Sequence, residues 1–254
     1  MSRVPLSVLV TTKNEERTIR ACLESARFAE EIVVVDSGST DGTLAIVRPL
    51  ADRVLEHPYE SPAAQKNWSL PQLAHDWVLI LDADERVTPE LRAEIEAVLS
   101  GSPSRAGYWI RRENWFYGEP IRSAGWQRDR VLRLLDRTKG AYRPVLVHEE
   151  IELQGEAGTL SAKLLHEPYR DLDQYFEKWS RYSAWSAEEL RRKRVRATGA
   201  RLLLRPWLRF VRMYVLEGGF REGRRGIVLC GLAAFSVFTK YARRWESEMG
   251  DGRR

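Results

Sequence analysis

The sequence predicts an α/β fold with a mixed, mainly parallel sheet flanked by helices, followed by a C-terminal helical extension. Short runs of Val, Ile and Leu alternate with segments of helical periodicity through the first hundred residues, which favours a parallel sheet with right-handed crossovers. These runs are apolar without alternation, as in strands that are covered on both faces. From Asp171 onward the periodicity is helical.

Four strands and three helices are expected in this first part. The predicted strands are Leu6–Thr12, Ile32–Val35, Arg53–Leu55 and Trp77–Leu81. The helices are expected to open at Asn14, Thr43 and Thr88. Thr88 and Pro89 are typical of a helix cap and a first helical residue. Asp36 and Asp82 each follow a strand directly, and ligands of such sheets bind beyond the carboxyl ends of the strands.

The middle of the chain has a different character. Gly107–Gly118 is rich in aromatic residues, and Val131–Leu135 and Val145–Leu153 have the composition of further strands. We predict a mixed-sheet extension here that shapes a second binding site. The expected domains are 1–169, an α/β domain with halves 1–105 and 106–169, and 170–254, a basic helical extension.

Composition narrows the class of protein. The chain has 254 residues, 43% hydrophobic and 30% charged, which is typical neither of a disordered chain nor of an ordinary membrane protein. The N-terminal residues lack the apolar core and cleavage site of a signal peptide, so a cytoplasmic protein is expected. Cys22 and Cys230 stand alone, without metal-ligand or redox spacing, and are expected to be core thiols.

Positive charge is concentrated in the tail. Residues 170–254 carry 20 Lys and Arg against 10 Asp and Glu, whereas residues 1–169 carry 21 against 26. A helix is expected to open at Pro206, and Gly226–Val237 is apolar but too short to span a bilayer. The arginines at helical spacing are Arg205, Arg209 and Arg212. The tail therefore predicts peripheral docking on anionic lipid of the inner membrane face; a packed helical pair with a solvated arginine face is the alternative.

The triplet Asp82-Ala83-Asp84 follows the fourth predicted strand. Two carboxylates this close repel one another unless a cation lies between them. Carboxylate oxygens suit Mg²⁺ or Mn²⁺, and Mg²⁺ is commonly held by one or two carboxylates together with substrate phosphates. The position after a fully apolar strand favours a metal–diphosphate site over a solvated turn.

The loop Asp36–Gly42 follows the second predicted strand and contains two glycines. A carboxylate at Asp36 would accept hydrogen bonds from a nucleoside; the alternative is a turn that caps the next helix through Asp41 or Ser39. The loop is neither a Gly-x-Gly-x-x-Gly dinucleotide loop nor a phosphate-binding Gly-x-x-x-x-Gly-Lys loop. NAD and ATP binding are therefore not favoured.

Together these segments resemble family 2 glycosyltransferases of the GT-A fold, a Rossmann-like α/β fold. The matching segments are LSVLVTTKNEE (6–16), VDSGSTDGT (35–43), QKNW (65–68), WVLILDADE (77–85), Arg112-x-Asn114, Gly125-Trp126, Arg133-Leu134, Val147-His148-Glu149, His166 and Tyr175–Tyr182. The resemblance spans nearly the whole chain and is strongest to the lipopolysaccharide-core β-glucosyltransferases. It implies an inverting transfer of a hexose, with glucose favoured, from a UDP-sugar to a glycan or glycolipid acceptor.

The resemblance also implies roles for individual residues. The donor nucleotide would be bound by Thr12, Glu15, Asp36, Lys66 and Asp82. Asp84 and His166 would hold Mn²⁺ or Mg²⁺. Glu149 would be the catalytic base with His148 beside it, although the sequence has His148-Glu149 where many relatives have an acidic pair, and Glu150 follows directly. A carboxylate within reach of the acceptor hydroxyl can take its proton, and a divalent ion can stabilise the leaving diphosphate.

Arg112, Asn114 and Trp126 are candidates for the acceptor site. Aromatic rings stack on sugars, and Arg recognises phosphate or carboxylate on an anionic acceptor. Packing of the aromatic residues within the sheet explains the same pattern equally well.

Three other functions are weighed against the glycosyltransferase. A nucleotidyltransferase would need a basic, glycine-rich loop after the first strand, where only Lys13 is present. Nucleic-acid binding is not expected, because the basic tail alternates with bulky aliphatic residues and contains no such motif. A non-catalytic relative is not favoured because the acidic triplet is intact. The sequence gives no indication of the oligomeric state.

Overall fold

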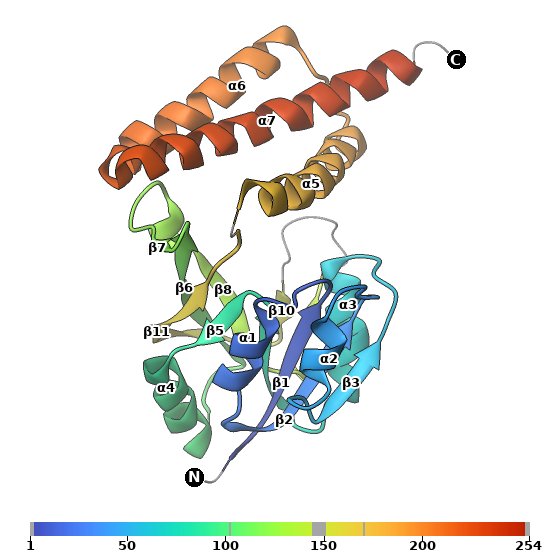
Figure 1. Ribbon diagram of the computed structural model, residues 1–254, viewed down its shortest axis with the longest axis vertical. Coiled ribbons are helices and arrows are strands. Elements are labelled where there is room, and N and C mark those ends of the chain that lie inside the picture. Colours follow the sequence, from blue (N-terminus) through green and yellow to red (C-terminus); the bar gives the residue numbers. More distant parts are fainter. Residues whose placement is uncertain (1–2, 102, 144–150, 170, 252–254) are drawn as a thin grey trace. The chain divides into compact units, whose positions relative to one another are not determined.

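The computed structural model describes residues 3–101, 103–143, 151–169 and 171–251 (Figure 1). The chain forms two compact units. The first contains Met1–Glu113 and Asp129–Glu167, and the second contains Asn114–Arg128 and Pro168–Arg254. The segment Asn114–Arg128 thus belongs with the C-terminal helices.

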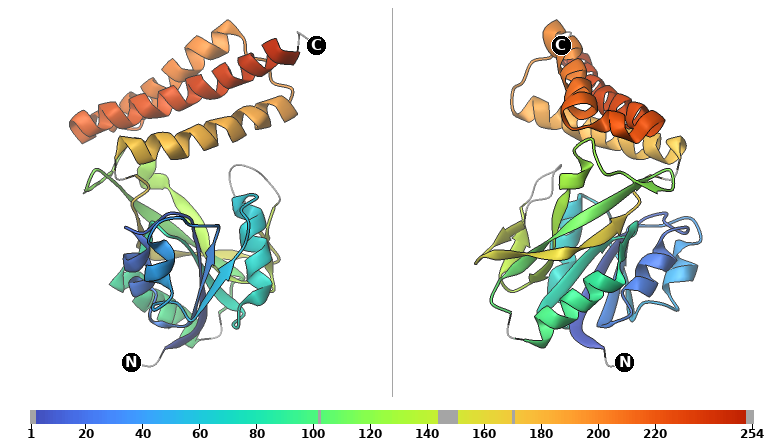
Figure 2. Two further views of the ribbon diagram at one scale, coloured as in Figure 1. Left: turned by 45° about the vertical axis from the view of Figure 1, so that its right-hand side comes forward. Right: turned by 90° about the vertical axis from the view of Figure 1, so that its left-hand side faces the viewer.

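The first unit is built on a sheet with the order β3-β2-β1-β4-β8-β6-β11-β5 (Figures 1 and 2). Its parallel strands are β1 (Val4–Thr12), β2 (Ala29–Asp36), β3 (Arg53–Glu56) and β4 (Trp77–Asp82). In this register Thr12 lies opposite Asp36 on β2, and Thr11 lies opposite Asp82 on β4. All four predicted strands are confirmed.

Helices cover both faces of these strands. The helices are α1 (Ile19–Ser25), α2 (Thr43–Val47), α3 (Pro62–Ser69) and α4 (Pro89–Ser100). Val8 and Val10 of β1 pack in a core with α1 and α4, whereas Leu9 between them packs in a second core with α3. Alternate residues of a strand point to opposite faces, and here the residues on both faces are buried. The sequence of the strand therefore does not alternate between apolar and polar residues.

Two helix starts test the local sequence signals. The Thr88 hydroxyl accepts a hydrogen bond from the Leu91 amide at 3.1 Å, and α4 begins at Pro89 as predicted. The expected start of the first helix at Asn14 is wrong, because α1 begins at Ile19. Asn14 has φ 55° and bonds to the loop after β2, so the chain there is a turn.

The other half of the sheet is antiparallel. It contains β8 (Arg130–Asp136), β6 (Gly107–Phe116), β11 (Ala157–His166) and β5 (Glu85–Val87). A small separate sheet pairs β9 (Gly140–Tyr142) with β10 (Ile151–Leu153). The predicted strand Val131–Leu135 is confirmed; of Val145–Leu153, the part before Ile151 lies outside the described residues.

The second unit is mainly helical. Its elements are β7 (Glu119–Pro120), η2 (Trp126–Arg128), α5 (Leu172–Arg192), α6 (Gly199–Val211), a π-helical turn η3 (Arg212–Leu216), η4 (Gly219–Glu222) and α7 (Gly223–Asp251). Met213, Leu229 and Cys230 form the centre of its core together with Phe116 and Ile121.

Two expectations for these helices are corrected. Pro206 does not open a helix but lies inside α6, because Thr198 caps a helix that starts at Gly199. The apolar stretch Gly226–Val237 lies inside the 29-residue α7. One described segment, Gly219–Gly250, is long and apolar enough to cross a membrane. Length and composition alone do not distinguish such a span from the core helix of a soluble protein.

Candidate active site

The candidate site lies at the carboxyl ends of β1 and β4, where the order of the parallel strands reverses. From β1 the chain winds outward to β2 and β3, and it then returns to the other side of β1 as β4. Adjacent connections leave in opposite directions at such a point, and the crevice between them is where open α/β sheets bind ligands. The register places Thr12, Asp36 and Asp82 at this edge.

The loops that follow β1 and β2 are bonded to one another. The Asn14 side chain accepts a hydrogen bond from the Thr40 amide at 2.8 Å, and the Glu15 amide donates to the Thr43 hydroxyl at 2.8 Å. The Glu15 carboxylate accepts from the Thr18 hydroxyl at 2.8 Å. These bonds join two loops that are far apart in sequence into one ordered rim of the crevice.

Asp36 is fully buried and orders its own loop. One of its carboxylate oxygens accepts from the amides of Gly38 and Ser39, both at 2.8 Å, and the other accepts from the Ser39 hydroxyl. This geometry shows that Asp36 orders the loop, and it leaves room for nucleoside binding, since a carboxylate oxygen has capacity for further donors.

Thr12, opposite Asp36, has a polar atom that the fold does not use. Its side chain is buried, and its hydroxyl has no hydrogen-bond partner among the described residues. Buried polar groups are paired in the great majority of proteins, so such an atom requires an explanation, one of which is a ligand.

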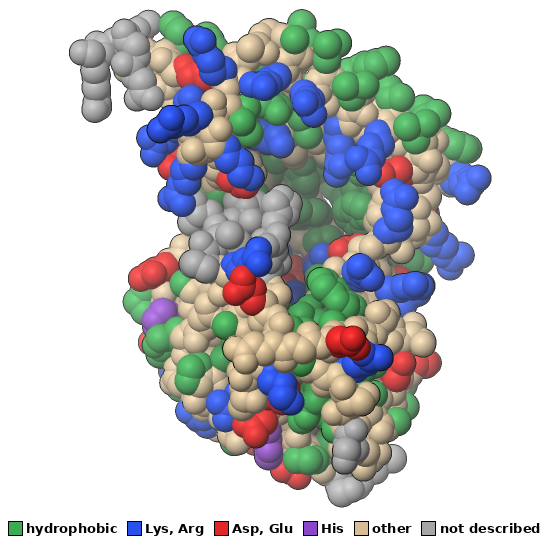
Figure 3. All heavy atoms as spheres, turned by 180° about the vertical axis from the view of Figure 1, so that it is seen from behind, with side chains coloured by type: hydrophobic (Ala, Val, Ile, Leu, Met, Phe, Trp, Pro, Cys, Tyr) green, Lys and Arg blue, Asp and Glu red, His purple; other side chains and the backbone are tan. Residues whose placement is uncertain are grey.

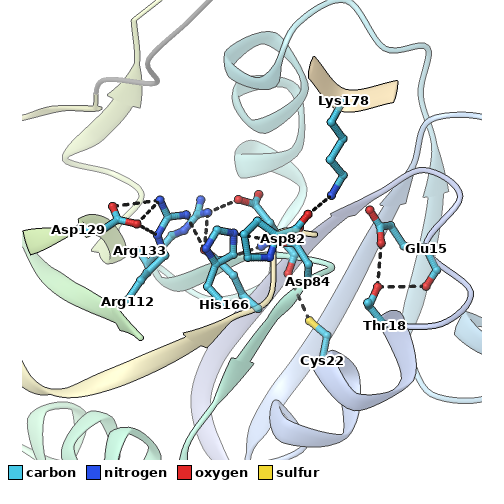
Figure 4. A network of polar contacts seen from close by, with 12 residues as sticks. Glu15, Thr18, Cys22, Asp82, Asp84, Arg112, Asp129, Arg133, His166 and Lys178 are labelled. Atoms are coloured by element: carbon cyan, nitrogen blue, oxygen red, sulfur yellow. Dashed lines mark hydrogen bonds and ion pairs between the residues drawn. The ribbon is translucent and has the colours of Figure 1, made fainter. Parts of the chain in front are cut away.

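Asp82 is held by two cations, of which Figure 4 labels Arg133. Lys66, which is buried on α3, lies 3.2 Å from one carboxylate oxygen, and Arg133 of β8 bonds to the other. Burial alone would raise the pKa of Asp82, but the charges of Arg133 and Lys66 outweigh this and lower the pKa well below its usual value. Asp82 is therefore ionised throughout the physiological range.

The same arginine continues the network to Glu85. Glu85 is fully buried and accepts from Arg133 at 2.9 Å and from Arg112 at 3.3 Å, while its other oxygen accepts from the Asp82 amide at 2.9 Å. Arg112 is also bonded to both oxygens of Asp129. Carboxylate and guanidinium groups alternate through this network, so each buried charge in it lies beside a charge of opposite sign.

Asp84 pairs with His166. The nearest atoms of the carboxylate and the imidazole are 3.7 Å apart, and both side chains are largely buried. Burial lowers the pKa of His166 below its usual value, although the charge of Asp84 opposes this shift. A lowered pKa favours the neutral imidazole near pH 7, which is the form that binds metals. The backbone also joins the two segments, because the Glu167 amide donates to the Asp84 carbonyl at 3.1 Å.

This pair fits a divalent cation that is completed by its substrate. In the part of the chain that the structure describes, no group of three or more His, Cys, Asp and Glu side chains could hold a metal ion. One carboxylate and one imidazole leave most coordination positions open for phosphate oxygens and water, as in the sites where Mg²⁺ is bound together with phosphates. The imidazole favours Mn²⁺ over Mg²⁺ in such a set.

Beneath the triplet lies a buried thiol. The Cys22 thiol is directed to the Asp82 carbonyl at 3.6 Å. Burial raises the pKa of Cys22 well above its usual value, and the carboxylates of Glu85, Asp84 and Asp82 raise it further. The thiol is therefore protonated and unreactive, as expected for a core cysteine.

Of the remaining predicted residues, the structure describes Arg112, Asn114 and Trp126. His148 and Glu149 lie outside the described residues. The guanidinium of Arg112 is engaged by protein carboxylates, so it is part of the buried network. Asn114 and Trp126 belong to the second unit, where Asn114 donates to the Trp126 carbonyl at 3.4 Å and the Trp126 ring packs edge-on against Phe116.

Arg133 and Glu85 were not predicted as site residues. The sequence contains a signal for Arg133, because an arginine interrupts an otherwise apolar strand and a buried charge requires a partner. Glu85 follows the acidic triplet directly. The partner of each becomes apparent only when β8 pairs with β4 in the sheet.

Comparison with known proteins identifies the family. The family model described as Glycosyl transferase family 2 matches residues 7–141. The lipopolysaccharide core biosynthesis glycosyltransferase LpsC of Rhizobium meliloti (strain 1021) is 31% identical over 98% of this chain and 97% of its own length. The chain belongs to glycosyltransferase family 2. It is also similar to an uncharacterised glycosyltransferase of Rickettsia typhi, with 24% identity over 94% of this chain and 86% of that protein.

Membership of this family confirms that the chain is a glycosyltransferase with the predicted GT-A fold: a mixed sheet flanked by helices, with further helices toward the C-terminus. Among solved structures, glucosyl-3-phosphoglycerate synthase from Mycobacterium tuberculosis, in complex with Mn²⁺, UDP and glucosyl-3-phosphoglycerate, matches with a TM-score of 0.36 and 23% identity. That match covers 44% of each chain.

We expect Arg133→Met to destabilise the first unit by about 3–5 kcal/mol, because it leaves the carboxylate of Glu85 buried without its closest cation. The free energy of unfolding in urea measures the effect. Arg86→Met is the control, since Arg86 pairs with Glu167 at a partly exposed site and should cost less than about 1 kcal/mol. Equal losses in the two variants would show that the buried network does not stabilise the fold.

Proposed function

We propose that this glycosyltransferase transfers a hexose, with glucose as the first choice, from a UDP-sugar to a hydroxyl of the lipopolysaccharide inner core. The reaction would invert the anomeric carbon and depend on Mn²⁺ or Mg²⁺. The similarity to LpsC along almost the full chain supports this acceptor class. Another lipid-linked or polysaccharide acceptor is the alternative, and a nucleotidyltransferase reaction is disfavoured by family membership.

One observation carries the proposal: the pair Asp84–His166 lies next to the sheet edge that contains Asp82, Asp36 and the Thr12 hydroxyl, which has no partner among the described residues. A nucleoside diphosphate needs hydrogen-bonding groups as well as a metal site. Its ribose and base require hydrogen-bonding side chains, and its phosphates require a cation. The two carboxylates of the triplet would divide these tasks.

The charges around Asp82 favour this division. Its two oxygens are already paired with Lys66 and Arg133, so Asp82 is suited to receive a ribose hydroxyl in a fixed orientation. Lys66 would then lie beside the nucleotide and add positive charge near the diphosphate. Asp84 and His166 would hold the metal, which when bound would act as a Lewis acid on the leaving diphosphate.

The acceptor hydroxyl must lose its proton as the new glycosidic bond forms. Glu149 remains our candidate for the base, with His148 beside it and Glu150 as the alternative. The proton would pass from the hydroxyl to the carboxylate, the acceptor oxygen would bond to the anomeric carbon, and UDP would leave from the opposite face. One displacement of this kind inverts the anomeric carbon without a covalent enzyme intermediate.

Asp84→Ala should weaken the metal-dependent binding of UDP by more than about 100-fold, because even the loss of a residue behind a metal ligand costs about 10–100-fold. Isothermal titration with UDP, with and without Mn²⁺, measures the effect. Asp76→Ala is the matched control, an exposed aspartate just before β4. Wild-type binding of UDP and Mn²⁺ by Asp84→Ala would refute the metal site.

Thr12→Val should weaken UDP binding about three- to tenfold, which is the usual net value of one hydrogen bond, and leave the unfolding free energy unchanged, because the hydroxyl has no partner within the described fold. Thr43→Val should instead reduce stability, since its hydroxyl accepts from the Glu15 amide. Unchanged UDP affinity in Thr12→Val would place that hydroxyl outside the donor site.

Glu149→Gln should bind UDP and metal as the wild type does but lose transfer by about 100- to 10,000-fold, the usual contribution of a general base. Transfer to purified lipopolysaccharide acceptor from a radiolabelled donor measures it. Glu150→Gln serves as the comparison and should retain most activity. The reverse result, with Glu149→Gln active and Glu150→Gln inactive, would assign the base to Glu150.

A further inference from the structure

The segment α6–η3 of the second unit exposes a row of large apolar side chains. Leu203 is 72% exposed, Trp207 60% and Leu216 78%. The other exposed apolar residues of the segment are Leu204, Leu208 and Val215. Single exposed apolar residues are common, but a contiguous exposed apolar surface indicates a site that binds a protein, a ligand or a membrane. We refer to Leu203, Leu204, Trp207, Leu208, Val215 and Leu216 as the apolar row.

The fold of the second unit does not use this row. No residue of α6 is buried, and the segment contributes to the core through Met213, with Phe210 and Tyr214 packed beside it. At 3.6 residues per turn, Phe210 and Met213 lie on a different side of the helix from Leu204 and Leu208. The apolar row is therefore an outer face, and its residues can be changed without opening the core.

A stripe of arginines runs beside the row. Its members are Arg201, Arg205, Arg209 and Arg212, and the sequence from Gly199 to Leu216 contains no Asp or Glu. Arg205 and Arg209 are exposed. Figure 3 shows hydrophobic side chains along the outer edge of the helices at the top, next to Lys and Arg side chains. Arg205 and Arg209 thus place positive charge beside the apolar face, whereas Arg212 is paired with Glu217 at 3.0 Å.

Neighbouring lysines add to this positive charge. Burial lowers the pKa of Lys240 on α7, and the nearby charges of Arg209, Arg205 and Lys193 lower it further, although Glu189 opposes them. Like charges gathered at one place repel, and an anionic surface would relieve that repulsion.

We infer that α6–η3 docks in the plane of an anionic lipid bilayer, with the apolar row among the acyl chains and the arginines at the lipid phosphates. An amphipathic helix with Arg beside a Trp- and Leu-rich face is the form that binds membrane interfaces. Anionic headgroups supply the opposite charge, worth about fivefold in binding for each arginine near the surface. A protein partner would have to offer a comparably acidic and apolar groove.

The sequence and contacts of α7 favour docking on the bilayer surface over a membrane span. The helix is long enough to cross a bilayer, but its uncharged run between Arg225 and Lys240 is about 21 Å long at about 1.5 Å per residue, so a span across the bilayer core of about 30 Å would also bury charged side chains. The run also makes polar contacts with α5, because the Tyr175 hydroxyl bonds to the Leu232 carbonyl at 3.1 Å and to Ser236 at 2.9 Å.

The inference deepens the proposed function, since it gives the surface at which a lipid-linked acceptor would be met. It rests on the exposure and charge of α6–η3, however, and vesicle binding requires neither UDP nor metal. A failure of docking therefore leaves the transfer reaction testable, and an inactive enzyme leaves docking testable.

The test is flotation of the full chain with vesicles of phosphatidylglycerol and phosphatidylethanolamine, and with vesicles of phosphatidylcholine alone. The wild type should float with the anionic vesicles and at least about tenfold less with the neutral ones. Arg205→Gln/Arg209→Gln and Trp207→Ser/Leu208→Ser should each reduce flotation at least about tenfold. The controls are Arg20→Gln/Arg48→Gln, the same loss of charge at exposed sites of the first unit, and Trp207→Phe, both of which should float like the wild type.

Four results would overturn the inference. The first is no flotation with anionic vesicles, and the second is flotation that neither double variant reduces. The third is protein that stays with the vesicles after an alkaline carbonate wash, which would indicate a membrane span. Loss of self-association in Trp207→Ser/Leu208→Ser, with vesicle binding unchanged, would likewise assign the row to a second copy of the chain.

Discussion

The ion-pair network of Asp82, Glu85, Arg133 and Arg112 is the constraint on which the first unit depends. Glu85 has no exposed surface, so its charge is tolerable only because two guanidinium groups and one amide surround it. Those groups come from β4, β6 and β8, the strands where the sheet changes from parallel to antiparallel. The network therefore joins the two halves of the sheet at the point where the candidate site lies.

The same network gives the two aspartates of the triplet different chemical environments. Asp82 faces Lys66 and Arg133, so its charge is already balanced by the protein. Asp84 faces an imidazole whose lowered pKa favours the neutral form, which is the form that binds metals. Two identical side chains, two residues apart, are thus prepared for different partners, because β4 ends at Asp82 and Asp84 lies in the turn that leads to β5.

Much of the fold and part of the site follow from local sequence patterns. The four parallel strands, the Thr88 cap and the placement of Asp36 and Asp82 at strand ends depend on periodicity and on cap chemistry, which neighbouring residues decide. The link from Arg133 to Glu85 depends instead on which strands pair, and the local pattern does not contain that information. Similarly, Pro206 favoured a helix start, but the cap at Thr198 extended the helix through it.

Each compact unit contains one of the two cysteines, and both are buried. Cys22 lies beneath the acidic triplet in the first unit, and Cys230 lies in the core of the second. A buried thiol reacts with a labelling reagent only when the surrounding structure opens. The reaction rate of each native thiol therefore reports local unfolding of the core in its own unit. No engineered probe is needed to compare the two units.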